Sequence, residues 1–278
     1  MFERGRPACP VACTYCHVTE HEVRRAEWNA GPRLGVNRAC TFVNVAPWED
    51  ASVLDDFPWE VLRGDHVGFT AVTDPLWPRL NTTLRTWIDG SEQAGARLLT
   101  VVTKWPRVSA SAARLLADHR VMVVYGVGNE AVERSTLVAK QVAVAHLLNA
   151  GVEVLPTFHP YIPGVTSLAI LPELVRLGVR EVDVKGFRWD PAMRLPTHPQ
   201  FSADREVLVE DGWRERVVDA GMSLLSPREW YLREAPRGGG VSHGTALAGW
   251  TQVSALALVA SSSEVERVRD AYIHRRTL

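Results

Sequence analysis

Three of the four cysteines in this chain lie within a span of eight residues. Cys9, Cys13 and Cys16 have the spacing C-x3-C-x2-C, and Tyr15 directly precedes the last of them. Thiolates are soft ligands that suit iron–sulfur clusters and zinc. A four-iron cluster has four corners, so three cysteines would leave one iron without a protein thiolate. The spacing therefore predicts a metal centre with one iron open to an outside ligand.

A zinc site is the alternative interpretation of the same cysteines. Cys9, Cys13 and Cys16 would then be joined by either His17 or Cys40. Structural zinc sites usually combine two closely spaced pairs of ligands, such as C-x2-C. The sequence contains no second pair, so the cluster is the favoured interpretation.

Composition is that of an ordinary globular protein. The chain has 278 residues, 46% of them hydrophobic and 23% charged, and a formal net charge of −1. This balance gives no reason to expect wholesale binding to nucleic acid or to a membrane surface. The N-terminus lacks the apolar core of a signal peptide, and no apolar run is long enough to span a bilayer. We therefore expect a cytoplasmic protein. Its only lysines are Lys104, Lys140 and Lys185.

From residue 66 the sequence alternates between apolar β-branched runs and helical segments, a pattern typical of βαβ units with a parallel sheet. Together with a strand expected ahead of Cys9, the pattern gives six βα units in an α/β fold. It fits a partial (β/α)6 TIM-like barrel and also allows a flat doubly wound sheet. In both architectures ligands lie at the carboxyl ends of the strands. The expected strands cover residues 66–72, 97–102, 121–125, 152–157 and 180–187, and the expected helices cover 81–95, 109–119, 130–150 and 167–177.

The remaining segments are less regular. Residues 30–63 contain several breakers and are predicted to be irregular, forming a long loop on the substrate side. We expect residues 1–190 to form the barrel core and residues 191–278 to form an extension that packs on the same domain. Four further segments have local predictions: short helices at 18–29, 204–220 and 227–234, a flexible loop at 237–240, and a closing helix at 264–276.

The cysteine motif resembles the signature of the radical S-adenosylmethionine (radical SAM) superfamily. The resemblance implies a [4Fe–4S] cluster on Cys9, Cys13 and Cys16, held in a loop that follows the first strand of a partial barrel. It also implies that the amino and carboxylate groups of S-adenosylmethionine chelate the open iron. One electron from the cluster then cleaves the sulfonium, and a 5′-deoxyadenosyl radical abstracts hydrogen from the substrate.

Three later motifs resemble the branch related to spore photoproduct lyase. They are T-D-P-x-x-P at residues 73–78, T-K at residues 103–104 and P-x-I-P-G at residues 160–164. With the cysteines, the likeness runs from about residue 9 to about residue 190. Photoproduct lyases also use a hydrogen-donating cysteine after the second strand, and residues 71–73 contain none, which argues against repair of DNA photoproducts. Cys40 is a possible donor from the long loop, although a buried, inert thiol is the favoured interpretation.

The same resemblance and the chemistry of S-adenosylmethionine predict the polar contacts of that ligand. Lys104 and Arg134, the latter placed early in the helix after strand 121–125, are candidates for its carboxylate. Thr70, Thr73 and Asp74 are candidates for its ammonium group, although Asp74 is equally well explained as a turn or capping residue.

The remaining candidates lie at other strand ends. Tyr15 is expected near the adenine, and the amide of Asn129 near the ribose or the carboxylate. Gly126 and Gly128 allow the backbone to approach a ligand closely, but they do not form a dinucleotide fingerprint. Candidates for substrate contact are His159, Lys185 and Trp77, each of which also has an ordinary structural interpretation.

The resemblance therefore implies a single-domain radical SAM enzyme that abstracts hydrogen from a small molecule, with the biosynthesis of specialised metabolites as one setting. The implied cofactors are a [4Fe–4S] cluster and S-adenosylmethionine. The implied partners are the substrate and an electron donor such as flavodoxin or ferredoxin, with no membrane and no nucleic acid expected. The alternatives are a zinc-stabilised binding protein without catalysis and a radical SAM enzyme that modifies or repairs nucleic acid.

Overall fold

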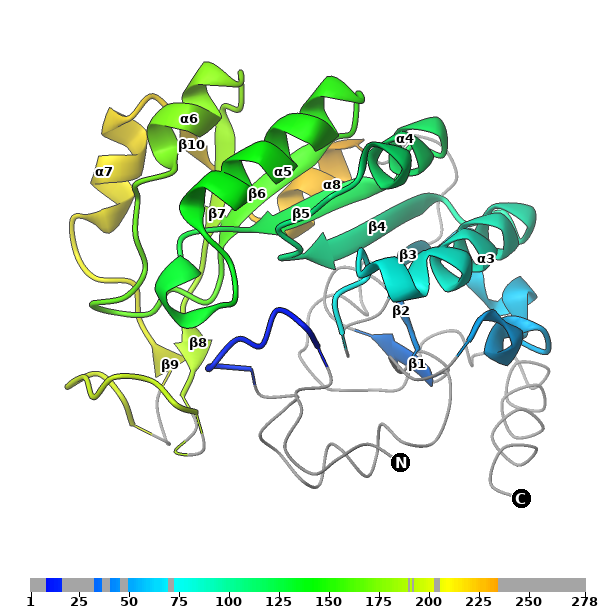
Figure 1. Ribbon diagram of the computed structural model, residues 1–278, viewed down its shortest axis with the longest axis horizontal. Helices are drawn as coiled ribbons and strands as arrows, with labels where there is room; N and C mark the ends of the chain where they lie inside the picture. Colours follow the sequence, from blue (N-terminus) through cyan, green and yellow to red (C-terminus); the bar gives the residue numbers. More distant parts are fainter. Residues whose placement is uncertain are drawn as a thin grey trace.

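An eight-stranded sheet forms the centre of the computed structural model, with the strands in the order β1-β2-β3-β4-β5-β6-β7-β10 (Figure 1). The structure describes residues 9–16, 33–36, 41–45, 50–69, 73–189, 191, 193–202 and 206–234. The strands of the sheet are β1 (Arg33–Val36), β2 (Thr41–Asn44), β3 (His66–Phe69), β4 (Leu98–Thr103), β5 (Met122–Gly126), β6 (Val154–Phe158), β7 (Glu181–Val184) and β10 (Ser223–Leu224). A separate antiparallel pair is formed by β8 (Phe187–Arg188) and β9 (Glu206–Val207).

The order and direction of the strands distinguish the predicted partial barrel from a flat doubly wound sheet. Strands β2 to β7 are all parallel and follow one another in chain order, while β1 is antiparallel to β2 at one edge. A doubly wound sheet would reverse its strand order at a switch point. No such reversal occurs among the described strands. The fold is therefore an open, TIM-like partial barrel, which confirms the predicted α/β class.

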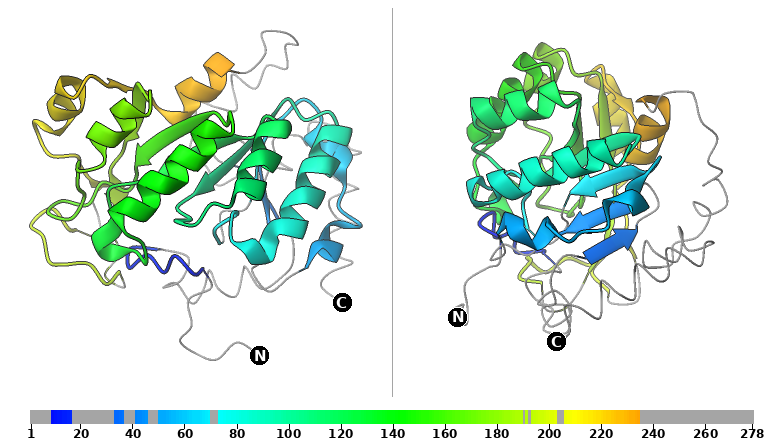
Figure 2. Two further views of the ribbon diagram at one scale, coloured as in Figure 1. Left: turned by 45° about the horizontal axis from the view of Figure 1, so that its top comes forward. Right: turned by 90° about the vertical axis from the view of Figure 1, so that its right-hand side faces the viewer.

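Helices cover the two faces of the sheet unequally. Helices α3 to α6 lie along one face, and α8 lies against the other (Figures 1 and 2). None of the described helices is long and apolar enough to cross a bilayer. The α-helices are α3 (Asn81–Gln93), α4 (Ala110–Asp118), α5 (Leu137–Asn149), α6 (Leu171–Arg176), α7 (Trp213–Asp219) and α8 (Pro227–Glu234). The 3-10 helices are η1 (Ala51–Leu54), η2 (Trp59–Leu62), η3 (Pro78–Leu80) and η4 (Glu130–Val132).

The side chains of β5 pack alternately on the two faces of the sheet. Val123 and Tyr125 belong to the large core beneath the helices, whereas Met122 and Val124 pack with Trp230 of α8. Successive side chains of a strand point to opposite faces, so an all-apolar strand needs cover on both sides. Helix α8 supplies part of that cover on the second face.

The prediction that residues 30–63 are irregular is wrong. This region contains β1, β2, η1 and η2, and the side chains of Val43 and Val45 are fully buried. Strands of four residues between breakers give almost no local signal. Their extended conformation depends on pairing with each other and with β3, which the sequence does not display.

Three predicted helices begin too early. The helix predicted for residues 167–177 is α6, which begins only at Leu171. Residues 130–150 form η4, then an extended residue at Glu133, and then α5, whose N-cap Thr136 accepts a hydrogen bond from the Ala139 amide. Arg134 therefore precedes the helix instead of lying in it. Within residues 204–220 the helix is only α7, which starts after Gly212 in the left-handed region (φ +77°), and β9 pairs with β8 before it.

Several predictions lie outside the described residues. They concern the strand ahead of Cys9, the helix at 18–29, the loop at 237–240 and the closing helix at 264–276. The candidates His17, Cys40 and Thr70 also fall there.

Replacing Gly90 by alanine is expected to destabilise the protein by about 1–3 kcal/mol, as overpacking does. In an exposed helix the same change would stabilise by about 0.4–1 kcal/mol. Here a Cβ at residue 90 would lie 2.4 Å from Cε2 of Trp59, so the ring must move. Urea denaturation measures the difference, and the double variant Gly90→Ala, Trp59→Leu should recover stability. A more stable single variant would contradict the prediction.

Asp183 is expected to make stability depend on pH. Burial raises the pKa of this carboxyl above its ordinary value, although Thr157 donates a hydrogen bond to it at 2.6 Å and Lys185 opposes the shift. A raised pKa in the folded state means that stability present below the unfolded pKa is lost as pH rises through the folded pKa. The variant Asp183→Asn lacks this loss, so its stability relative to wild type should improve from pH 4 to pH 8. The prediction would be contradicted if the free energies of unfolding of the wild type and of Asp183→Asn changed equally with pH.

Candidate metal centre

Residues 9–16, hereafter the cysteine loop, lie at the edge of the sheet where the parallel strands end (Figure 1). Two backbone hydrogen bonds tie the loop to the segment after β5: the Thr14 amide donates to the Val132 carbonyl at 3.0 Å, and the Arg134 amide donates to the Val11 carbonyl at 2.9 Å. On its other side the Arg194 amide donates to the Thr14 carbonyl at 3.0 Å. The loop is therefore held from both sides by the scaffold.

Two tight turns place the three cysteines within this loop. The Ala12 amide donates to the Cys9 carbonyl at 3.2 Å, and the Cys16 amide donates to the Cys13 carbonyl at 3.1 Å. Ala12 adopts the left-handed region with φ +49°, which closes the first turn. None of the three cysteines is in a disulfide, and all three are partly buried. The spacing seen in the sequence is thus built into one compact loop.

Burial controls the chemistry of two thiols. It raises the pKa of Cys9 to about 12, with Asp74 adding to the effect and a hydrogen bond from Thr73 opposing it. Burial and the charge of Glu133 also raise the pKa of Cys13 well above its ordinary value. Both groups are therefore neutral thiols in the metal-free protein. Metal binding at these residues must release protons.

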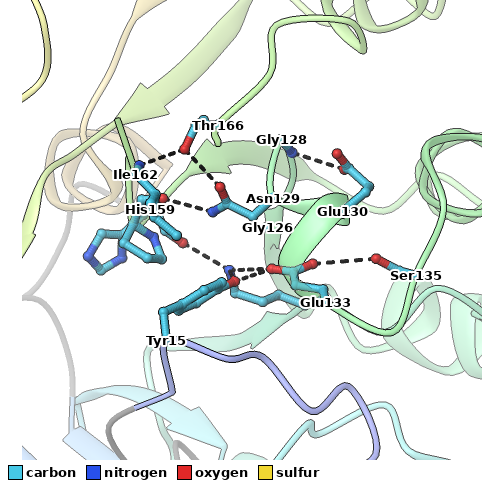
Figure 3. Close-up of polar contacts among 12 residues, drawn as sticks. Tyr15, Gly126, Gly128, Asn129, Glu130, Glu133, Ser135, His159, Ile162 and Thr166 are labelled. Carbon is cyan, nitrogen blue, oxygen red and sulfur yellow. Dashed lines mark hydrogen bonds and ion pairs between the residues drawn. The ribbon is translucent and has the colours of Figure 1, made fainter. Parts of the chain in front are cut away.

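A buried ionic network lies directly beside the loop (Figure 3). The Nζ of Lys104 donates to Oη of Tyr15 at 2.6 Å, to Oε1 of Glu133 at 3.2 Å and to the His159 carbonyl at 3.0 Å. The Tyr15 hydroxyl in turn donates to Oε1 of Glu133. From α5, Lys140 donates to Oε2 of Glu133 at 2.5 Å and to the Gly126 carbonyl at 2.7 Å. Glu133 thus joins two lysines and the tyrosine of the loop.

Charge pairing keeps this network ionised in spite of its burial. Burial opposes the charge of Glu133, but Lys104 and Lys140 outweigh it and lower the pKa of the carboxyl. Burial likewise opposes the charge of Lys104, and Glu133 outweighs it, so the pKa of this lysine is raised. The side chains of Glu133 and Lys140 are fully buried, and that of Lys104 is 19% exposed.

Gly126 makes room for Lys104. A Cβ on this glycine would lie 2.7 Å from Cγ and 3.0 Å from Nζ of the lysine. The close approach expected at Gly126 is therefore used by a protein side chain. Gly128 has φ +87°, and a Cβ there would meet Phe158 at 2.5 Å, so it too approaches protein.

Asp74 connects the ends of two strands. Its Oδ1 accepts from the Thr103 hydroxyl at 2.7 Å and from the Leu76 amide at 3.0 Å, and its Oδ2 accepts from the Lys104 amide at 2.7 Å. Burial raises the pKa of this carboxyl, while these hydrogen bonds oppose the shift. Both oxygens are thus engaged in fixing the backbone that carries Lys104. Thr73 lies against Cys9 through its hydrogen bond to the thiol.

Asn129 is also engaged within the protein. Its side-chain nitrogen donates to the Pro160 carbonyl at 2.8 Å, and its oxygen accepts from the Thr166 hydroxyl at 2.8 Å. The same Thr166 oxygen accepts from the Ile162 amide at 2.6 Å. The amide therefore joins the end of β5 to the segment after β6, on the side of the network shown in Figure 3.

The other candidates lie further toward solvent. The side chain of Arg134 is exposed, although its backbone holds the cysteine loop. His159 and Lys185 are also exposed, and the imidazole of His159 points away from Glu133 while its carbonyl accepts from Lys104. Trp77 is half-buried, with the Arg79 guanidinium 5.9 Å from its ring centre.

Sequence reasoning missed Glu133 and did not assign Lys140 to the site. The available signal was the scarcity of lysine, since only three of 31 basic residues are lysines and two of those three meet at Glu133. Glu133 itself has no distinctive neighbours in the sequence. Its role depends on contacts with residues 118, 29 and 7 positions away.

The donor set of the loop is of the chemical type that iron–sulfur clusters take. Three thiols on one short loop are soft ligands, and a cluster needs them on three separate irons, not converging on one ion. Among the described residues, no group of three His, Cys, Asp or Glu side chains is gathered closely enough for a single metal ion. The hydroxyl of Thr14, inside the loop, is buried without a hydrogen-bond partner among those residues. An acceptor such as a cluster sulfide or a bound ligand would satisfy it.

No protein-family model matches this sequence, and no curated protein matches it either. Among solved structures, one similar chain is a cysteine-to-serine variant of spore photoproduct lyase. The two chains are 13% identical, with a TM-score of 0.48, and the match covers 84% of this chain and 73% of that chain.

Proposed function

We propose that this chain is a radical SAM enzyme that acts on a small molecule. The observation that carries the proposal is the cysteine loop itself. Three cysteines that are not in disulfides lie on two consecutive turns, and backbone hydrogen bonds fix them where the parallel strands of a partial barrel end. This is the edge at which α/β barrels bind ligands. The resemblance of the C-x3-C-x2-C motif to the superfamily signature supports the same function.

Cys9, Cys13 and Cys16 would hold a [4Fe–4S] cluster, with S-adenosylmethionine on the fourth iron. When bound, such a cluster supplies the electron that cleaves S-adenosylmethionine to the radical that removes hydrogen from the substrate. The protein's part is to position the ligand and exclude water. Tyr15 helps to exclude water because its ring is buried with Ile162 and other apolar side chains beside the loop.

Lys104 and Arg134 border the loop, and one of them would meet the carboxylate of S-adenosylmethionine. Lys104 has acceptors for its three donors within the protein, so a ligand would have to replace one of them. Arg134 offers an exposed guanidinium on a backbone that is bonded to the loop. Thr73 would lie near the ammonium group. Tyr15, Asp74 and Asn129 keep their proposed places at the site, the last two mainly by fixing the strand ends.

The substrate would enter on the exposed side of this edge, where His159, Lys185 and Trp77 remain the proposed contacts. Residues 1–190 would supply the catalytic core and residues 191–278 an extension of the same domain. A flavodoxin or ferredoxin is the proposed electron donor.

Anaerobic reconstitution with iron and sulfide tests the proposal. We expect about four irons per chain, and an electron paramagnetic resonance signal of the reduced cluster that changes when S-adenosylmethionine is added. Reductant should then yield 5′-deoxyadenosine. A protein that binds zinc but neither iron nor sulfide would refute the proposal and favour a zinc-stabilised binding protein. A cluster whose signal ignores S-adenosylmethionine would refute it as well.

A further inference from the structure

The buried network beside the cysteine loop has an uneven charge. Lys104 and Lys140 contribute two ammonium groups and Glu133 contributes one carboxylate, and we call these three residues the lysine–glutamate triad. Tyr15 adds a hydroxyl and no charge. The triad therefore has one positive charge in excess. Asp74 is another acidic group near these lysines, and it accepts from the Lys104 amide at 2.7 Å. Burial raises the pKa of this carboxyl and so opposes its negative charge. A buried excess charge is costly, so the triad favours a further anion close by.

The excess charge faces the cysteine loop. Lys140 is enclosed on the α5 side, where its donors reach Glu133 and the Gly126 carbonyl. Lys104 lies on the loop side, 4.9 Å from the ring centre of Tyr15, and negative charge on Cys13 or Cys16 would stabilise its ammonium group. Cysteine thiolates that hold a metal centre would place an anion on this side of the triad.

We propose that the lysine–glutamate triad sets the reduction potential of the metal centre held by the cysteine loop. Adding one electron from an external donor makes the centre more negative by one charge, and a fixed positive charge nearby stabilises that product. Glu133 and Lys140 act as positioning residues through Lys104 and Tyr15, not as ligands. This inference rests on the proposed function, since it requires that a cluster is bound.

If the triad sets the reduction potential, two neutralising substitutions should shift this potential in opposite directions. Glu133→Gln keeps the shape of the side chain and removes the negative charge, so the potential should become more positive. Lys140→Met removes a positive charge and leaves Lys104 and Glu133 as a balanced pair, so the potential should become more negative. If the triad had a purely structural role, the reduction potential would shift in the same direction in both variants or would not shift in either of them.

Redox titration of the reconstituted proteins, followed by electron paramagnetic resonance, measures these shifts. Lys140→Arg retains the charge at the same position and should restore the wild-type potential, which makes it the matched control for Lys140→Met. Asp183→Asn neutralises another buried carboxylate, which is bonded to Thr157 instead of a lysine, and should leave the potential nearly unchanged.

The outcomes separate this inference from the proposed function. Opposite shifts, with rescue by Lys140→Arg, support it. A cluster that assembles normally but has the same potential in wild type, Glu133→Gln and Lys140→Met overturns the inference and leaves the proposed function intact. If Glu133→Gln does not fold, the comparison of Lys140→Met with Lys140→Arg decides alone. If circular dichroism shows that both neutralised proteins are unfolded without metal, the triad is structural and the inference is wrong. A wild-type protein that binds no cluster refutes both.

Discussion

Replacing Cys13 by alanine is expected to abolish cluster binding and, with it, the formation of 5′-deoxyadenosine. Cys13 is the middle cysteine of the loop, and its side chain packs beside Tyr15 near the ionic network. Two remaining thiolates cannot hold three corners of a cluster, and a methyl group offers no ligand. Iron and sulfide per chain should fall to background after anaerobic reconstitution, and 5′-deoxyadenosine should fall to the level seen without protein.

The fourth cysteine provides the matched control for this experiment. Cys40→Ala removes a thiol outside the C-x3-C-x2-C motif, so the variant should retain its iron and sulfide. The backbone bonds of the loop do not involve the Cys13 thiol, so Cys13→Ala should give the circular dichroism spectrum of the wild type. If Cys40→Ala loses the metal and Cys13→Ala keeps it, the assignment of the ligands is wrong.

Replacing Glu133 by alanine is expected to lower the free energy of unfolding by about 3–5 kcal/mol, the usual loss when one partner of a buried ion pair is removed. Its carboxylate lies 3.2 Å from Lys104 and 2.5 Å from Lys140, and it accepts from the Tyr15 hydroxyl. Without it, two ammonium groups face each other in the protein interior. Urea denaturation of the metal-free protein at pH 7 measures the loss.

The dependence of this loss on pH provides a second check. The pKa of Glu133 is lowered in the folded state, so its stabilising contribution is present above the unfolded pKa and is lost as pH falls through the folded pKa. The gap between wild type and Glu133→Ala should therefore narrow under acid conditions. Glu173→Ala breaks an ion pair of 2.6 Å with the exposed Arg176 and should have a much smaller effect. Equal losses at the two sites would show that burial does not strengthen the Glu133 pairs.

Local sequence patterns were sufficient for the scaffold that carries the site. Strands β4, β5 and β6 are apolar runs bounded by polar or breaking residues, and their positions agree with the predicted segments within two residues. Such runs form buried strands because a parallel sheet is covered on both faces, so that apolar side chains are buried along the whole strand. The cysteine loop was equally evident, since ligand type and spacing are properties of the sequence itself. These features require no knowledge of which segments meet.

Contacts between distant segments determined the features that local sequence patterns did not predict. Strand β2 is extended because β1 and β3 flank it, and four residues between breakers cannot signal this. The helix predicted from residue 130 is interrupted because Glu133 adopts an extended conformation and turns into the ionic network with Lys104, Lys140 and Tyr15. That arrangement gains its stability from charges brought together by four separate segments in a dry interior. The sequence by itself thus determined the candidate ligands and the scaffold. Only the tertiary structure determined the charges that surround them, because Coulomb energy depends on distance in space and on burial.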